Sequence, residues 1–239
     1  MYIGFDDTDT LDSDYGTGKL VRRFENVLPD GCSLWGVVRQ QLLVDERIPY
    51  TSHNSSACAI IDIPHPSLMD DIISKAIDHI EQESTEGSDP GLCIAGENDP
   101  ILTHLTTLGR LCTSKVMTQR EILEAANGTY ISGHGGTNDG IIGAVAAVGL
   151  TASGWCGRFI EFGRLRKLPP MMTVSEIERL GIHVISIDRN TMVPGKDDCV
   201  HTKGWIRPRL WGSKPVLPVL PVGKNRWESI GEKRNKQHG

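Results

Sequence analysis

The chain has 239 residues, of which 38% are hydrophobic, and its formal net charge is -5. This length allows one large domain or two small ones, and the hydrophobic fraction is sufficient for a core. The negative net charge argues against a protein that holds nucleic acid mainly by bulk positive charge, although a local basic patch remains compatible with it. No apolar run is long enough to cross a bilayer and no signal peptide is visible, so we expect a cytoplasmic protein without membrane contact.

The first 96 residues predict alternating strands and helices. Strands are expected at residues 2–5, 33–44, 57–63 and 91–95, and helices at residues 16–27 and 66–83. The longer helix carries Leu68, Ile72, Ala76 and Ile80 on one face, because apolar side chains three or four apart meet there. The order βαββαβ is typical of a ferredoxin-like unit, so we predict an α+β fold that begins with such a half.

Residues 97–197 are expected to form a second, helix-rich α/β half. Its helices are predicted near residues 100–111, 119–126, 141–150 and 174–180, and its strands at 158–163 and 183–188. The stretch 194–222 is rich in proline, tryptophan and glycine, which favours loop with short strands. From Gly223 the chain is polar, with five basic and two acidic side chains, and we expect a mobile tail. The predicted divisions are therefore 1–96, 97–197 and 198–239.

Carboxylates follow the first expected strand directly, at Asp6, Asp7 and Asp9. In an extended stretch Asp7 and Asp9 point to the same side. Two carboxylates, together with phosphate oxygens and water, suit the octahedral shell of magnesium. The three aspartates are therefore candidate metal ligands. The alternative is a solvated turn in which one Asp or Ser caps the next helix.

A short glycine-lysine turn opens the first expected helix, with Gly16, Gly18 and Lys19. Backbone N–H groups at a helix start attract anions, glycines allow close approach, and Lys19 can neutralise phosphate charge. The segment is not a Walker A loop, because Ser13 stands where the first glycine belongs and Leu20 follows the lysine. The alternative is an ordinary helix start with Lys19 in solvent.

Two further polar segments are candidate nucleotide contacts. The first leads into the helix at 141–150 and contains Gly135, Gly136, Thr137, Asn138 and Gly140. Glycines before a helix fit a phosphate cradle, and the alternative is a tight turn onto a closely packed helix. The second is the polar loop around Thr51 and Asn54, whose side chains suit phosphate or ribose and equally suit a plain loop.

The opening Ile3-Gly4-Phe5-Asp6-Asp7-Thr8-Asp9-Thr10 resembles the I-G-I-D-D-T-D-S opening of the archaeal tRNA-isoleucine 2-agmatinylcytidine synthetases. Thr51 to Asn54 is similar to that family's Lys-Thr-x-x-Asn loop, and Asp89-Pro90-Gly91 to its Asn-Pro-Gly turn. Gly135 to Gly149 is similar to its glycine-rich lead into G-x-I-G-A-x-A-A-x-G. The resemblance covers the catalytic half of the family. The OB-type domain and the zinc ribbon that hold tRNA in the family are not expected here, because the chain stops near residue 239 and no two of its cysteines form a C-x-x-C pair.

In that family, ATP and magnesium activate a cytidine of the tRNA anticodon, and agmatine then replaces the carbonyl oxygen at position 2 of the base. The resemblance implies that Asp6, Asp7 and Asp9 hold magnesium. It places Thr17 near a family threonine that can carry a phosphoryl group. It also implies that the segment from Gly135 to Gly140 belongs to the nucleotide site.

We therefore expect an ATP- and magnesium-dependent carbon–nitrogen ligase that activates an oxygen by phosphoryl or nucleotidyl transfer for displacement by an amine. Its catalytic residues are Asp7, Asp9 and Thr17, and its partners are a nucleotide, agmatine or another amine, and tRNA. One alternative is an ATP-dependent ligase or kinase that acts on a small molecule rather than tRNA. Another is a regulator that binds nucleotide without turnover.

Overall fold

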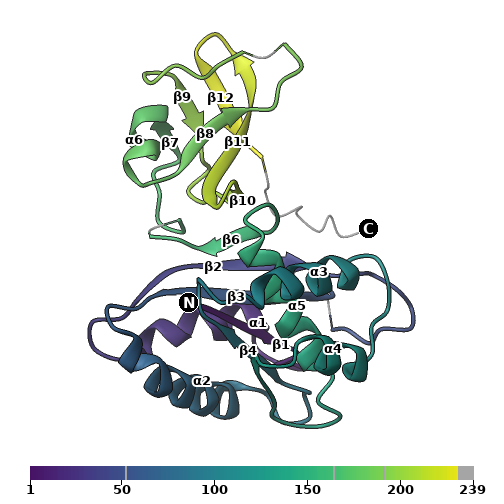
Figure 1. Cartoon of the computed structure of the whole chain (residues 1–239). Helices are drawn as coiled ribbons and strands as arrows, with labels where there is room; N and C mark the ends of the chain where they lie inside the picture. The colour runs from purple at the N-terminus through teal and green to yellow at the C-terminus, as the bar shows by residue number, and fades with distance from the viewer. Residues whose placement is uncertain (52, 164, 191, 231–239) are drawn as a thin grey trace. The chain divides into compact units, whose positions relative to one another are not determined.

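The computed structural model describes residues 1–230 except 52, 164 and 191, and the chain divides into two compact units, Met1–Gly157 and Arg158–Gly239 (Figure 1). The division expected between residues 96 and 97 falls inside the first unit, because helix α5 (Gly140–Ala152) packs on strand β1 (Tyr2–Asp6). Across the described residues, none of the helices combines the length and the apolar character needed to cross a membrane.

The first unit is built on an antiparallel sheet with the strand order β5-β4-β1-β3-β2. Besides β1, its strands are β2 (Ser33–Gln41), β3 (Ser55–Asp62), β4 (Gly91–Ala95) and β5 (Tyr130–Gly133). The continuously apolar run at residues 57–63 predicted an interior strand, and β3 lies between β1 and β2. The short strand β5 was not predicted, because its four residues lead directly into the glycine-rich segment.

Two helices pack on one face of this sheet. They are α1 (Thr17–Arg23), which continues into the 3₁₀ turn Phe24–Val27, and α2 (Met69–Glu83), which follows the 3₁₀ turn Pro66–Leu68. The ring of Phe5 lies 5.7 Å from that of Phe24 and 6.4 Å from that of His79, measured between centroids. The expected helices at 16–27 and 66–83 are therefore confirmed, and their apolar faces meet the side of β1 that carries Phe5.

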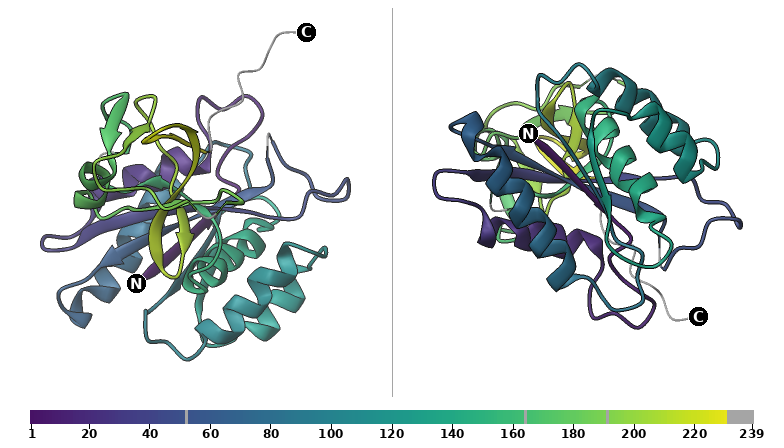
Figure 2. Two further views of the ribbon diagram at one scale, coloured as in Figure 1. Left: turned by 90° about the horizontal axis from the view of Figure 1, so that it is seen from above. Right: turned by 60° about the horizontal axis from the view of Figure 1, so that its bottom comes forward.

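Three further helices, α3 (Leu102–Cys112), α4 (Gln119–Ala125) and α5, belong to the other side of the sheet (Figure 2). Apart from Ile142, the residues of α5 from Gly140 to Thr151 are buried, as expected for a helix that is apolar all round. A Cβ at Gly4 would collide with the carbonyl oxygen of Ala144, and one at Gly149 with that of Leu105. Glycine is required at both positions because α5 approaches β1 and α3 so closely.

The second unit contains one short helix, α6 (Val174–Arg179), among its described residues. Its strands run in the order β6-β10-β11-β12-β9-β7, and β8 pairs with β11 in parallel. Their bounds are β6 (Arg158–Glu161), β7 (Met171–Thr173), β8 (His183–Ser186), β9 (Cys199–His201), β10 (Arg209–Trp211), β11 (Lys214–Gly223) and β12 (Arg226–Ser229).

Residues 198–239, expected as loop with short strands and a mobile tail, contain β9, β10, β11 and β12 among their described residues. Strand β11 has ten residues despite its three prolines, because Val216, Leu217 and Val219 are buried against neighbouring strands. The segment that follows Gly223 forms β12, whose Trp227 indole N–H donates a hydrogen bond to Asp198. Residues 231–239 lie outside the described residues.

Candidate functional site

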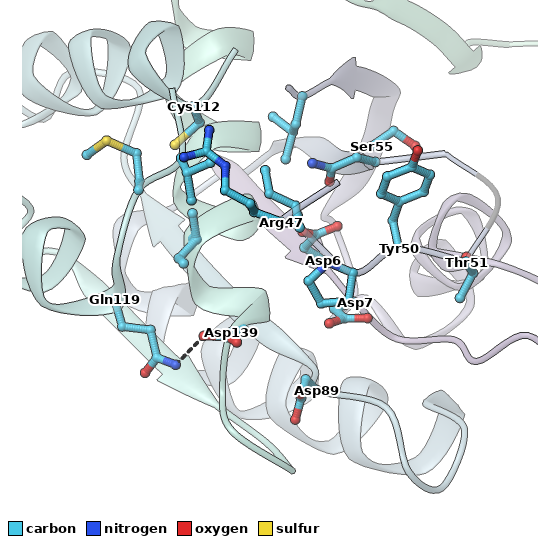
Figure 3. Close-up of a pocket in the computed structure, with 18 of the residues that line it drawn as sticks. Asp6, Asp7, Arg47, Tyr50, Thr51, Ser55, Asp89, Cys112, Gln119 and Asp139 are labelled. Carbon is cyan, nitrogen blue, oxygen red and sulfur yellow. Dashed lines mark hydrogen bonds between the residues drawn. The ribbon is translucent and has the colours of Figure 1, made fainter. Parts of the chain in front are cut away.

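A cavity of about 480 Å³ opens in the first unit beside the carboxyl end of β1 (Figure 3). This volume is within the range of small-molecule sites. One part of its lining is acidic and another apolar. The lining residues include Asp6, Asp7, Asp9, Thr17, Leu42, Arg47, Tyr50, Thr51, Asn54, Asp89, Cys112, Lys115, Met117, Asp139, Ile142 and Gly143.

The acidic wall is assembled from three distant parts of the chain. Asp6 ends β1 and is paired with Gly91 across the sheet, so the turn that contains Asp89 lies beside it. The backbone N–H of Gly140 donates to the carbonyl oxygen of Asp89 at 3.1 Å, which brings the start of α5 and its neighbour Asp139 to the same place. Figure 3 shows the carboxylates of Asp6, Asp7, Asp89 and Asp139 around the cavity.

Burial and nearby negative charge raise the pKa values of two carboxyl groups in this wall, Asp6 and Asp7. Burial, followed by repulsion from Asp7, raises the pKa of Asp6 to about 8. Burial also raises the pKa of Asp7 to about 6, with further contributions from the charges of Asp89, Asp9 and Asp139. A carboxyl group with a raised pKa is one whose negative charge is poorly compensated by its surroundings. A bound cation would supply the compensation that the protein does not.

The backbone of the acidic loop differs from the extended chain that the sequence suggested. Asp7 has φ 52°, in the left-handed region, so the alternation of side chains along β1 ends at this residue. The expectation that Asp7 and Asp9 point to one side because the chain is extended is therefore wrong. Left-handed backbone at a non-glycine residue is a strained arrangement that clusters at functional sites.

Asp9 joins the acidic loop to the start of α1. Its Oδ1 accepts hydrogen bonds from the backbone N–H and the hydroxyl of Thr17, both at 3.1 Å, and its Oδ2 accepts one from the Thr51 hydroxyl at 3.2 Å. The Thr8 hydroxyl donates to the Thr17 hydroxyl at 3.0 Å. Asp9 thus performs the helix-capping task that was the alternative interpretation, and it does so while lining the cavity.

The glycine-lysine turn lies outside the cavity lining. Gly16, Gly18 and Lys19 are absent from that lining, whereas their neighbour Thr17 belongs to it. The ammonium group of Lys19 lies 4.6 Å from the centroid of the Tyr15 ring, an arrangement typical of a cation–π contact. The structure therefore brings Thr17, rather than the lysine, to the cavity.

The glycine-rich segment wraps around the turn that contains Asp89. The backbone N–H and the hydroxyl of Thr137 both donate to the Asp89 carboxylate, at 2.5 and 3.0 Å. Gly136 has φ 56°, and a Cβ there would collide with the same carboxylate. Asn138 also has left-handed backbone, with φ 64°. The cavity lining does not include Gly135, Asn138 or Gly140. The segment therefore fixes Asp89 and presents its neighbours Asp139 and Gly143 to the cavity.

Thr51 and Asn54 lie in the cavity lining, as predicted, on the loop between β2 and β3. The side-chain amide of Asn54 donates to the carbonyl oxygen of Leu43 at 2.6 Å, which closes the loop. Ser52, between them, lies outside the described residues. Asp89 and the wall around Cys112 and Met117 were missed, although the similarity of Asp89-Pro90-Gly91 to a family turn was a signal for the first.

The carboxylates of the acidic wall fit a metal ion only in part. Among the residues that the structure describes, no group of three or more His, Cys, Asp or Glu side chains is arranged to hold a metal by itself. Magnesium usually keeps several waters and binds through one or two carboxylates together with phosphate oxygens. The carboxyl groups of Asp6 and Asp7, whose pKa values are raised, fit that partial role.

Comparisons with known proteins find solved structures of similar fold. No family model matches the sequence, and no curated protein matches it. Solved structures that are similar in fold include a complex of TiaS, an isoleucine-tRNA agmatidine synthetase, with its tRNA and ATP, at 18% identity and TM-score 0.52, over 62% of this chain and 35% of that chain. The TiaS complex with the same tRNA, AMPCPP and agmatine is similar at 18% identity and TM-score 0.51, over 74% of this chain and 43% of that chain. A tRNA fluorescent labeling enzyme is similar at 20% identity and TM-score 0.50, over 62% of this chain and 35% of that chain.

These likenesses confirm, at the level of the fold, the resemblance that the acidic opening suggested. This chain spans between 35% and 43% of the length of the three structures named. The likeness therefore concerns a part of those proteins.

Proposed function

We propose that the chain is an ATP- and magnesium-dependent enzyme of the carbon–nitrogen ligase class, which activates an oxygen so that an amine can displace it. The observation that carries this proposal is the cavity beside β1. Its acidic wall contains Asp6 and Asp7, whose pKa values are raised to about 8 and about 6 by burial and by repulsion from neighbouring carboxylates. Such a wall suits a cation that in turn binds the phosphates of ATP.

The remaining walls offer complementary surfaces for a nucleotide. Met117 is buried and Ile142 half-buried in the cavity lining, and such apolar side chains suit a base. Thr51 and Asn54 offer a hydroxyl and an amide for ribose or phosphate oxygens. Arg47, whose guanidinium is held by two hydrogen bonds to the Asp45 carboxylate, supplies positive charge at the rim.

In this proposal magnesium takes its one or two direct carboxylate ligands from Asp6, Asp7 and Asp9. Asp89 is close enough to influence Asp7. Magnesium would supply charge neutralisation on the transferring phosphoryl group. Gly143 leaves space for the Asp6 carboxylate, because a Cβ at that position would collide with it. The side chains of the chain itself orient the nucleotide and exclude water from its reacting end.

Thr17 is the proposed phosphoryl acceptor. Its Oγ1 would form a bond to the γ-phosphorus while the bond from that phosphorus to the β–γ bridging oxygen breaks, and the hydroxyl proton would pass to Asp9 Oδ1. The hydrogen bond of 3.1 Å between these two atoms supports this direction of proton transfer. Thr17 is nearly buried, with 6% of its surface exposed, which limits competition from water.

The other predicted contacts remain part of the proposal. Gly16, Gly18 and Lys19 flank Thr17 outside the cavity lining, and Lys19 would reach the phosphates of ATP only after leaving the Tyr15 ring. The segment of Gly135, Gly136, Thr137, Asn138 and Gly140 would act through the residues it positions, Asp89 and Asp139. We also interpret β1 to β4 with α1 and α2 as a ferredoxin-like half, since their sheet order is β4-β1-β3-β2.

The experiment follows ATP turnover by the whole chain. Purified protein is incubated with labelled ATP and magnesium, with and without agmatine and total tRNA. Release of ADP or AMP only with tRNA supports modification of tRNA, and release without RNA supports a small-molecule ligase or kinase. Binding of magnesium-ATP without release under any condition would leave a nucleotide-binding regulator and refute the proposed enzyme.

A further inference from the structure

The two units carry opposite charges. Met1–Gly157 contains 9 Lys and Arg against 22 Asp and Glu, a formal net charge of -13. Arg158–Gly239 contains 16 Lys and Arg against 8 Asp and Glu, a formal net charge of +8. The overall charge of -5 conceals this difference. A strong asymmetry of charge along a chain is typical of proteins in which one part binds a polyanion.

Two arginines of the second unit lie side by side on paired strands. Arg158 on β6 and Arg209 on β10 are directly paired across the antiparallel ladder. Burial, and then the charge of Arg158, lowers the pKa of Arg209. Like charges placed opposite one another in a sheet are unfavourable. A bound anion would relieve this repulsion.

Two further arginines are held against one tryptophan. The guanidinium carbons of Arg166 and Arg207 lie 4.7 and 4.2 Å from the centroid of the Trp205 ring. Arg166 also donates to the carbonyl oxygen of Ile160, a β6 residue, at 3.2 Å, and lies 3.6 Å from the Glu161 carboxylate. Stacking on an aromatic ring orients the planar guanidinium, so less freedom is lost when it binds a phosphate with two hydrogen bonds.

We propose that the second unit binds the phosphodiester backbone of RNA through Arg158, Arg166, Arg207 and Arg209, and we call these four residues the arginine surface. Arg207 and Arg209 are two residues apart, and the carbonyl of Pro208 between them accepts from Phe159 N–H at 2.9 Å, so both lie next to β6. The first unit, at -13, would repel a polynucleotide, so an anchor is needed elsewhere. The choice of RNA over DNA rests on the proposed function.

The test measures fluorescence anisotropy of a fluorescein-labelled single-stranded oligoribonucleotide of mixed sequence, titrated with the full chain at several KCl concentrations. EDTA is present and ATP is omitted, so the result does not depend on turnover. The double variant Arg166→Ala/Arg207→Ala is expected to bind several-fold more weakly. Its plot of log affinity against log salt is expected to be shallower by about 0.7 for each phosphate that the variant no longer neutralises. Unchanged affinity and slope would overturn the proposal.

The matched control removes the same charge elsewhere in the same unit. Lys224→Ala/Arg226→Ala changes two exposed basic residues at the turn between β11 and β12 and should leave binding nearly unchanged. An equal loss of affinity in both double variants would mean that only bulk charge matters, which would overturn the arginine surface. Unlabelled single-stranded DNA of the same sequence should compete nearly as well as RNA, because the proposed contacts are to phosphates, and a failure of both to compete would overturn the proposal.

A conservative variant guards against a purely structural effect of the stacked arginines. Arg166→Lys/Arg207→Lys keeps both charges but loses the planar guanidinium groups, so its salt slope should stay that of the unmodified chain while its affinity falls between those of the unmodified chain and the alanine variant. In a lysine variant shown by circular dichroism to be folded, a salt slope as shallow as that of the alanine variant would overturn the proposal. ATP turnover without RNA binding would refute this inference alone, and RNA binding without turnover would refute the proposed function alone.

Discussion

One carboxylate oxygen of Asp9 accepts two hydrogen bonds from Thr17, one from its backbone N–H and one from its hydroxyl, each 3.1 Å long. The two residues are eight positions apart, and the acidic loop between them returns to the start of α1. The same interaction therefore anchors the start of the helix and, in the proposed mechanism, holds the hydroxyl against its proton acceptor. Stability and chemistry at this point can be separated by choosing different substitutions of Asp9.

Asp9→Ala should lower the free energy of unfolding by about 1 kcal/mol, the usual loss when a capping side chain is removed. Urea unfolding followed by circular dichroism measures this change. Asp9→Asn retains an oxygen acceptor and should lose less stability. However, its neutral amide cannot take the Thr17 proton, so labelling of Thr17 by γ-labelled ATP should disappear. Labelling at the original rate would contradict the role of Asp9 as base.

Asp7→Asn should abolish magnesium-dependent binding of ATP while the protein stays folded. Asparagine tolerates the left-handed backbone of this position, where φ is 52°, so the loop keeps its shape and only the charge is lost. Calorimetric titration with magnesium-ATP measures the affinity. Asp12→Asn is the control, because Asp12 is an exposed residue of the same loop outside the cavity lining. Equal affinities for the Asp7 variant and the unmodified chain would defeat the assignment.

Gly143→Ala should weaken binding of magnesium-ATP by about tenfold or more, which corresponds to roughly 1.4 kcal/mol. The added Cβ would occupy the space of the Asp6 carboxylate, a movable side chain, so the helix itself can persist. Gly4→Ala is the contrasting variant, because its Cβ would meet the backbone carbonyl of Ala144. It should cost about 2 kcal/mol of stability. The role of Gly143 in the site is contradicted if Gly143→Ala loses as much stability as Gly4→Ala and keeps the affinity of the unmodified chain for magnesium-ATP.

The stability of the first unit should fall as the pH drops below about 6.5, in part because of His79. This side chain is 6% exposed and its Nε2 lies 2.9 Å from the carbonyl oxygen of Leu20. Burial lowers the pKa of His79 below 6.5, so at acid pH the unfolded chain binds a proton that the folded chain does not. Unfolding is then favoured as the pH falls through the unfolded pKa towards the folded one. Urea unfolding between about pH 7 and about pH 5 should show a weaker pH dependence in His79→Gln.

Local patterns in the sequence predicted the elements whose character depends on their own residues. Helix α2 has an apolar stripe, and β3 has a continuous apolar run, and both were located from these features. Strand β11 was not located as one long strand, because prolines normally weaken a strand. Its burial against β8 and β10 depends on partners that lie elsewhere in the chain.

The sequence by itself determined that carboxylates follow β1 and that Thr51 and Asn54 form a polar loop, because these are matters of residue type and order. Only the tertiary structure decided that Asp89 and Asp139 join Asp6 and Asp7 while Lys19 turns to Tyr15. Pairing of β1 with β4 and the hydrogen bond from Gly140 to Asp89 bring together residues that lie far apart in the chain. Such contacts depend on strand register and helix packing, which no local spacing encodes.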